Sequence, residues 1–433
     1  MRIVHIIPGT GGTFYCQNCV RDAALVQALH AQRHDVLTIP LYLPLFASAS
    51  VLTADVPLFF GGVNVYLQQR FSIFRKTPRW LDRLFDATWI LRRAARREGS
   101  ISAAELGPMT LSMLNGPQGN QRKELDRLVT WIRERERPDV IHISNALLLG
   151  LVGELRRTLQ VPIVCSLQDE DTWIDAMRTP YARLCWDAMA ERASDVDAFV
   201  AVSQWYAEQM AVRLRMPRDR IKVVPIGIDL EDVEPAQLPF DPPVIGYLSR
   251  MSESQGLGLL VDAFIELKQD ARLRDLRLKA TGGITAADRA FVSGLRRKLR
   301  RHGMHDHVEF MSDFEKPKRR DFLRSITVLS VPVVRGEASG EFMLEALAFG
   351  VPVVQPCAGS FPELVNDTGG GLVYALDEED GLVKALMKLL LDPGYSIKLG
   401  QQGRAAVYDR YGIDRMAGDM LAVYQSLEAK SST

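Results

Sequence analysis

The sequence lacks any excess of charge of one sign. It has 53 Lys and Arg and 53 Asp and Glu among its 433 residues, so its formal net charge is zero. Proteins that bind nucleic acid are usually basic, as a whole or along one face, because contacts to phosphate need Lys and Arg. The overall balance therefore gives no indication of a nucleic-acid partner.

Cysteine and long apolar runs are also scarce. Five cysteines in a chain of this length do not make the disulfide framework of a small secreted domain, so we expect reduced cysteines. No apolar run approaches the ~18 residues of a transmembrane helix. The apolar run after Met1 is too short for a signal peptide. These absences predict a cytoplasmic protein.

Short β-rich apolar runs alternate with helical or polar segments along the whole chain. In the first half they are RIVHII, HDVLTIPLY, PDVIHIS, VPIVCSL and VDAFVAVS, and in the second half PPVIGYLSR, LRLKATGG, HVEFMS, ITVLSVPVV, VPVVQP and GGGLVYA. Such alternation is typical of parallel sheets joined by right-handed crossovers. We predict an α/β protein with two doubly wound, Rossmann-like domains facing a central cleft.

Two segments interrupt this rhythm. The stretch DLEDVEPAQLPFDPP is rich in proline and acid, and it predicts a linker between a first domain, 1–236, and a second, 242–410. Residues from about 44 to 123 form an apparent insertion in the first domain. Within it, Arg70 to Arg97 are basic and aromatic. This part is either a helical cap with solvated arginines or a peripheral contact with an anionic membrane.

The segment RGEASGEFMLEALAFGVPVVQP places three glutamates at the mouth of an apolar helix. Ser339 or Gly340 is the natural N-cap, and Gly350 is the expected stop. Glu337 then lies in the loop before the helix. A strand end followed by a helix N-terminus is a ready anion site, because unpaired N–H groups and the helix dipole point at one place.

Glu341 and Glu345 share one face of this helix, one turn apart. A carboxylate one turn inside the helix suits the acceptance of two hydroxyl protons from a ribose. An ordinary amphipathic helix with acids near its positive end is the alternative interpretation.

A series of motifs resembles glycosyltransferase family 4, a retaining family with the GT-B fold. The series comprises the E-x7-E pattern of Glu337 and Glu345 with ALAFGVPVVQP and GSFPELV after it, and also IHIS, VAVSQWYAEQM, VVPIGID, LSRMSESQGLGLLVDAF, TGG and MAGDMLAVYQSL. The resemblance extends over most of the chain outside the insertion. It implies that a last helix, within 411–433, crosses back to the first domain.

The resemblance also implies roles for residues that match the family's motifs. Glu345 would hold the nucleotide ribose, Arg250 the donor diphosphate, and Glu337 the donor sugar during catalysis. Asn145 follows the place where the family often has histidine and would hydrogen-bond the sugar. The other residues expected to bind the donor are Gly11, Gly12, Gln255, Gly340, Glu341, Phe342 and Met343.

The implied activity is metal-independent retaining transfer of a sugar from a nucleotide-sugar to a glycan, lipid-linked or small-molecule acceptor, without a cofactor. Gln255 stands where the family usually has lysine, and Ser144 where it often has histidine. Losing a fixed cation from a phosphate clamp weakens leaving-group stabilisation. A catalytically weak or inactive relative that binds nucleotide-sugar, or a partner, is therefore one alternative, and a nucleotide-sugar epimerase is another.

Three further signals remain open. Cys16 and Cys19 form a C-x-x-C pair, which has a structural or acceptor-side role or is a redox pair. The DED at 169–171 matches the D-x-D with which another class of glycosyltransferase binds a divalent metal, but a loop or helix cap also explains it. His142 lies inside an apolar run, which favours a buried core histidine over a catalytic base.

Overall fold

The computed structural model describes residues 1–8, 16–41, 59–60, 69 and 103–431. The described chain divides into two compact units. One contains β1 (Arg2–Ile7), Asn18–Pro225 and the residues from Met416 onward, and the other contains Ile226–Arg415. Arg70 to Arg97 and the glycines Gly11 and Gly12 lie outside the described residues.

The first unit is built on a six-stranded parallel sheet with the order β2-β1-β3-β4-β5-β6. Its strands are β1, β2 (Asp35–Pro40), β3 (Val140–Ile143), β4 (Ile163–Leu167), β5 (Ala198–Ala201) and β6 (Ile221–Val223). The α-helices along this part of the chain are α1 (Gln17–Ala31), α5 (Ala103–Leu114), α6 (Arg122–Arg135), α7 (Val152–Leu159), α8 (Glu170–Ile174), α9 (Tyr181–Arg192) and α10 (Gln204–Arg213). α5, at the end of the apparent insertion, packs against α9. The insertion's last part therefore belongs to the body of this unit.

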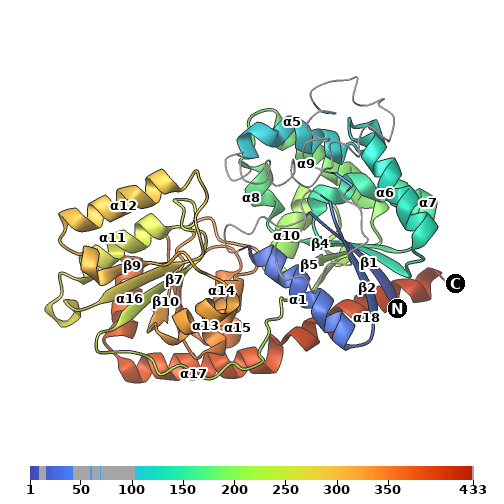
Figure 1. Cartoon of the computed structure of the whole chain (residues 1–433). Coiled ribbons are helices and arrows are strands. Elements are labelled where there is room, and N and C mark those ends of the chain that lie inside the picture. The colour runs from blue at the N-terminus through green and yellow to red at the C-terminus, as the bar shows by residue number, and fades with distance from the viewer. Residues whose placement is uncertain (9–15, 42–58, 61–68, 70–102, 432–433) are drawn as a thin grey trace. The chain divides into compact units, whose positions relative to one another are not determined.

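The second unit repeats the architecture with a parallel sheet of order β12-β11-β10-β7-β8-β9. Its strands are β7 (Val244–Leu248), β8 (Arg277–Thr281), β9 (Val308–Phe310), β10 (Val328–Leu329), β11 (Val353–Pro356) and β12 (Gly371–Tyr374). Its α-helices are α11 (Leu257–Leu267), α12 (Arg289–Arg301), α13 (Lys316–Arg324), α14 (Glu341–Ala348), α15 (Phe361–Thr368), α16 (Gly381–Leu390) and α17 (Pro393–Arg410). Figure 1 shows this sheet between α11 and α12 on one side and α17 on the other. Both predicted doubly wound sheets are thus present.

The predicted linker packs on the second unit. The amide of Ala236 donates to the carbonyl of Phe349, just after α14. The hydroxyl of Tyr408 and the guanidinium of Arg404, both from α17, donate to the carbonyl of Val233. These linker residues lie within the second unit, Ile226–Arg415.

The last helix, α18 (Ile413–Ser431), joins the core of the first unit from Met416 onward. There the Tyr424 hydroxyl lies 2.9 Å from Nδ1 of His142, and Nε2 of the same ring lies 2.8 Å from the Ser166 hydroxyl. Burial lowers the pKa of His142 well below its ordinary value. His142 is therefore the buried core histidine that its apolar surroundings favoured.

Candidate active site

The topology of the second sheet defines where a ligand would bind. The chain runs from β7 outward through β8 to β9 and then returns to β10, which pairs with the other edge of β7. In open α/β sheets, ligands bind at the carboxyl ends of the strands where the order reverses in this way. The loops after β7 and β10 meet that condition. They carry Arg250, Gln255 and Glu337, and α14, which begins after the second of these loops, carries Glu345.

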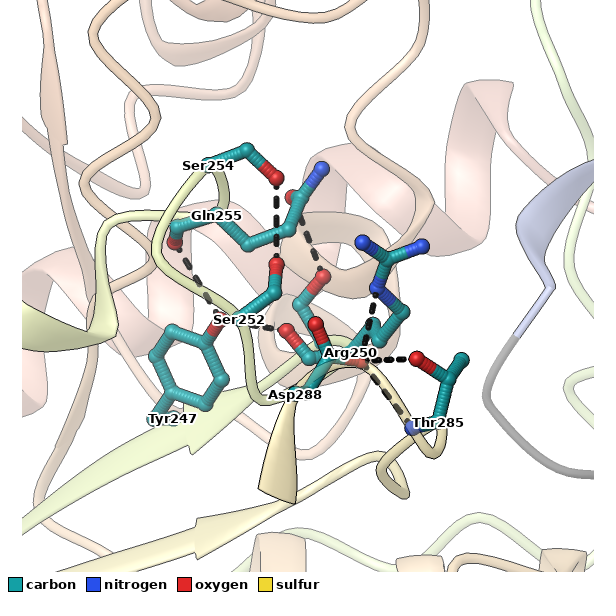
Figure 2. Close-up of polar contacts among 8 residues, drawn as sticks. Tyr247, Arg250, Ser252, Ser254, Gln255, Thr285 and Asp288 are labelled. Atoms are coloured by element: carbon teal, nitrogen blue, oxygen red, sulfur yellow. Dashed lines mark hydrogen bonds and ion pairs between the residues drawn. The ribbon is translucent and has the colours of Figure 1, made fainter. Parts of the chain in front are cut away.

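Arg250 follows β7 and is held by a buried carboxylate. Its Nε lies 3.3 Å from Oδ2 of Asp288, the residue before α12. The same Oδ2 accepts hydrogen bonds from the Thr285 amide at 3.0 Å and from the Thr285 hydroxyl at 2.6 Å. Figure 2 shows Arg250 beside both residues. About a third of the arginine side chain stays exposed, so a ligand can reach the guanidinium while Asp288 orients it.

Gln255 occupies the next bend of the same loop. Its Oε1 accepts from the Ser249 hydroxyl at 3.2 Å, and its carbonyl oxygen lies 3.2 Å from the hydroxyl of Tyr247. Figure 2 shows the ends of the Gln255 and Arg250 side chains pointing the same way, away from Tyr247. The amide can donate a hydrogen bond to a phosphate oxygen but brings no positive charge.

The loop after β10 fixes Glu337 by contact between backbones. A Cβ on Gly336 would lie 2.2 Å from the amide nitrogen of Gly359, and one on Gly359 would lie 2.5 Å from that of Glu337. Both glycines have positive φ. The carbonyl of Glu337 also accepts from the Ser360 amide at 3.0 Å. The loop after β11 thus holds the backbone that carries Glu337.

α14 begins as predicted, with Gly340 at the N-cap in the left-handed conformation and Gly350 just beyond the end. The side chains of Phe342 and Met343 are fully buried. Of the expected donor-binding residues, these two can reach a ligand only through their backbone. Glu341, in the first turn, is also buried.

Glu345 forms an ion pair that the sequence did not reveal. The Nε of Arg319, on α13, lies 3.0 Å from Oε1 and 2.9 Å from Oε2 of Glu345. Both side chains are nearly buried. Arg319 thus holds the Glu345 carboxylate in place on α14, the helix that follows β10.

In the first unit the sheet order reverses between β1 and β3, and Asn145 follows β3. Its Oδ1 accepts from the Leu147 amide at 2.7 Å and caps the short 3-10 helix Ala146–Leu151. Ser144 beside it is buried. A hydrogen bond from Asn145 to a sugar remains a prediction.

The DED segment has a structural part. Glu170 is fully buried and accepts from the amides of Ala146 and Gln168 and from the hydroxyl of Tyr206, at 2.9, 2.8 and 2.7 Å. It thereby joins the ends of β3 and β4 to α10. Asp171 accepts from the same hydroxyl at 3.0 Å. Among the described residues, no group of three or more His, Cys, Asp or Glu side chains is arranged to hold a metal ion.

Cys16 and Cys19, at the start of α1, form a disulfide, so the expectation of reduced cysteines is wrong for this pair. The other three cysteines are free, and Cys357 is exposed. Within the described part of the chain no helix is long and apolar enough to cross a bilayer.

Replacing Arg250 with methionine is expected to weaken binding of a nucleoside diphosphate by tenfold or more, on the order of a lost charge-assisted hydrogen bond. The affinity for the nucleoside alone should change little, because Arg250 would contact only phosphate. Titration calorimetry with UDP, GDP and ADP and their nucleosides measures both. Arg274→Met, at a highly exposed position of the same unit, is the control. Equal losses for diphosphate and nucleoside would contradict a phosphate role for Arg250.

Two family models match the chain, and together they cover more than half of it. Glycosyltransferase Family 4 matches residues 106–232, and Glycosyl transferases group 1 matches residues 242–392. A D-inositol 3-phosphate glycosyltransferase from Xylanimonas cellulosilytica is 31% identical over 57% of this chain and 60% of its own length. A lipopolysaccharide core biosynthesis mannosyltransferase from Rhizobium leguminosarum is 28% identical over 42% of this chain and 51% of its own length. The chain thus matches less than two thirds of each of these relatives.

Solved structures match nearly the whole chain. Sucrose-phosphate synthase from Thermosynechococcus elongatus has a TM-score of 0.72 at 16% identity, covering 99% of this chain and 100% of its own. HepE from Anabaena, in complex with UDP, has a TM-score of 0.68 at 15% identity, with the same coverage. These comparisons support neither an epimerase nor a non-catalytic relative. With its two parallel-sheet domains and these matches, the chain belongs to glycosyltransferase family 4 and has the GT-B fold.

Proposed function

We propose that the chain is a retaining glycosyltransferase that moves a sugar from a nucleotide-sugar to a hydroxylated acceptor. The observation that carries the proposal is the site at the strand-order reversal of the second unit. There the loop after β7 supplies Arg250, and the loop and helix after β10 supply Glu337, the N-terminus of α14 and Glu345.

The reaction requires charge to separate as the bond between sugar and phosphate breaks. Negative charge grows on the leaving phosphate, where the guanidinium of Arg250 and the N–H groups at the start of α14 stabilise it. Positive charge grows on the sugar, where the carboxylate of Glu337 stabilises it. If the acceptor hydroxyl attacks the sugar from the same face from which the phosphate leaves, the sugar keeps its anomeric configuration. In this scheme protein groups supply all the charge stabilisation, so we propose metal-independent transfer without a cofactor.

The relatives favour a polyhydroxylated acceptor. One relative glycosylates D-inositol 3-phosphate, and another is a mannosyltransferase of lipopolysaccharide core biosynthesis. For this chain we propose a glycan, a lipid-linked glycan or a small polyol. We place the reaction in the cytoplasm, where nucleotide-sugars are made. A peripheral membrane contact through Arg70 to Arg97 remains a separate proposal, because that segment lies outside the described residues.

A donor screen tests the proposal. The protein is incubated with UDP-, GDP- and ADP-sugars, with and without mixed polyol and glycan acceptors, and nucleoside diphosphate release is measured. We expect one donor class to be consumed faster when an acceptor is present, and NMR of the product to show the donor's anomeric configuration. Glu337→Gln, which keeps the size but removes the charge, should slow the reaction at least tenfold.

Three results would contradict the proposal. Release of an epimerised free sugar would indicate a different reaction on the same fold. A product of opposite anomeric configuration would exclude retention. Failure of every donor to bind, measured as an unchanged melting temperature at saturating nucleotide-sugar, would exclude the donor site itself.

A further inference from the structure

Arg319 is the one arginine of α13 that is buried, although it carries a charge. Its Nε lies between the two oxygens of Glu345, at 3.0 and 2.9 Å. Its Nη1 donates to the carbonyl of Phe314 at 3.0 Å, in the loop after β9. One guanidinium therefore joins that loop to the helix that starts after β10.

Packing does not account for this arginine. α13 already buries Phe322 and Leu323 against the unit, and its other basic residues stay at the surface or half-buried. A buried ion pair contributes little to stability compared with apolar residues of the same size, because both charges lose their hydration. An aliphatic residue at 319 opposite a neutral residue at 345 would pack as well. The reason for the Arg319–Glu345 ion pair therefore lies in the candidate active site and not in stability.

The pair changes what the carboxylate of Glu345 can do. A carboxylate offers about four acceptor positions, and Arg319 uses the side of both oxygens that faces α13. The contact fixes the rotamer, because the guanidinium is itself tied to the Phe314 carbonyl. The two carboxylate oxygens are then held in one orientation. Two adjacent hydroxyls of a ribose need such a pair of oriented acceptors.

We propose that Arg319 is a positioning residue that orients Glu345 for both hydroxyls of the nucleotide ribose. It makes the site selective for ribonucleoside over 2′-deoxyribonucleoside diphosphates. This inference rests on the proposed nucleotide-sugar function. Arg319 belongs to none of the motifs that support the proposed function.

The test compares affinities for matched nucleotides. UDP, GDP and ADP and their 2′-deoxy forms are titrated calorimetrically into wild type, Arg319→Met and Lys318→Met. We expect wild type to prefer the ribonucleotide about tenfold, the scale of one hydrogen bond to a charged group. Arg319→Met should reduce that preference to about twofold or less. Lys318→Met, at an exposed neighbouring position of α13, should retain it.

Arg319→Lys separates orientation from charge. It keeps a positive charge, but a flexible ammonium does not hold the carboxylate in the geometry of a planar guanidinium. We expect an intermediate preference of about threefold to fivefold. Arg319→Lys also tests the positioning role of Arg319 if the methionine variant does not fold. If Arg319 had only a structural role, its replacement would lower the affinity for the ribonucleotide and for the 2′-deoxyribonucleotide equally. The ratio of the two affinities would then stay unchanged.

The outcomes distinguish this inference from the proposed function. If wild type binds none of the three nucleotides, the proposed function fails. If wild type binds a nucleotide but the preference is unchanged in Arg319→Met and Arg319→Lys, the proposed function stands and the role of Arg319 is overturned. If wild type binds ribonucleotides and 2′-deoxyribonucleotides equally well, the role of Arg319 is overturned as well.

Discussion

Gly359→Ala is expected to reduce sugar transfer by about a hundredfold, although residue 359 supplies no side chain to the site. The added Cβ would lie 2.5 Å from the amide nitrogen and 2.7 Å from the carbonyl oxygen of Glu337. Contacts that short force backbone to move. A shift of about 1 Å in a catalytic group can cost about a hundredfold in rate. Initial-rate measurements on the donor that the screen identifies would report the loss.

The chain offers a matched control at Gly303, just beyond α12. Gly303 has φ +67° and Gly359 has φ +60°, so alanine suffers similar left-handed strain at both positions. A Cβ on Gly303 would meet nothing within 4 Å. Gly303→Ala should therefore lose the stability that left-handed strain costs but keep its transfer rate.

The melting temperatures of both variants show whether they are folded at the assay temperature. If Gly359→Ala is folded and transfers sugar as fast as Gly303→Ala, the contact with Gly359 does not set the position of Glu337. A change confined to KM would show instead that the loop positions the donor and not the catalytic carboxylate.

The strands of both sheets could be predicted because parallel strands covered on both faces read as continuous apolar runs. All the predicted runs contain strands of the structure. β6, a three-residue edge strand with the exposed Lys222 at its centre, was missed. β9 is also a three-residue edge strand and has the exposed Glu309 at its centre, but it was predicted, so length and exposure alone do not explain the difference. The linker was recognised by its composition, but composition does not show that Val233 and Ala236 hydrogen-bond to the second unit.

Local features of the site could be predicted, and its tertiary contacts could not. The start of α14 at Gly340 follows from local capping preferences, which depend on neighbouring residues alone. The ion pair of Glu345 with Arg319 joins two helices across the tertiary structure. No spacing rule links them. The available signal was the position of Arg319, three residues before Phe322 and four before Leu323, which places it on the buried face of α13. That signal is visible only once the helix register is known.

Glu170 shows the same limit in the first unit. Three acidic residues in a row favoured a loop, a cap or a metal site, and all three interpretations place the side chains near solvent. The structure instead buries the middle carboxylate among three hydrogen-bond donors. Burial raises its pKa from 4.5 to about 7, although the donated hydrogen bonds act in the opposite direction. The consequence is a dependence of stability on pH.

The stability that Glu170 contributes is expected to fall as the pH rises from 4.5 to about 7. In that window the folded chain keeps the proton and the unfolded chain has lost it, so the free energy of unfolding decreases with pH. The shift corresponds to about 3 kcal/mol. His142 acts the other way: its lowered pKa means that folding loses stability as the pH falls below 6.5.

Urea unfolding at about pH 5 and about pH 8 isolates the contribution of Glu170 when wild type is compared with Glu170→Gln. The variant cannot ionise at this position, so the stability difference, wild type minus variant, should shrink by about 3 kcal/mol from the lower to the higher pH. His142 is present in both proteins and cancels. Glu208→Gln, at an exposed position of α10, should leave this difference constant. If the stability difference instead increases with pH, the hydrogen bonds from Ala146, Gln168 and Tyr206 lower the pKa of Glu170 more than burial raises it. Glu170 would then be an ionised carboxylate in the folded chain.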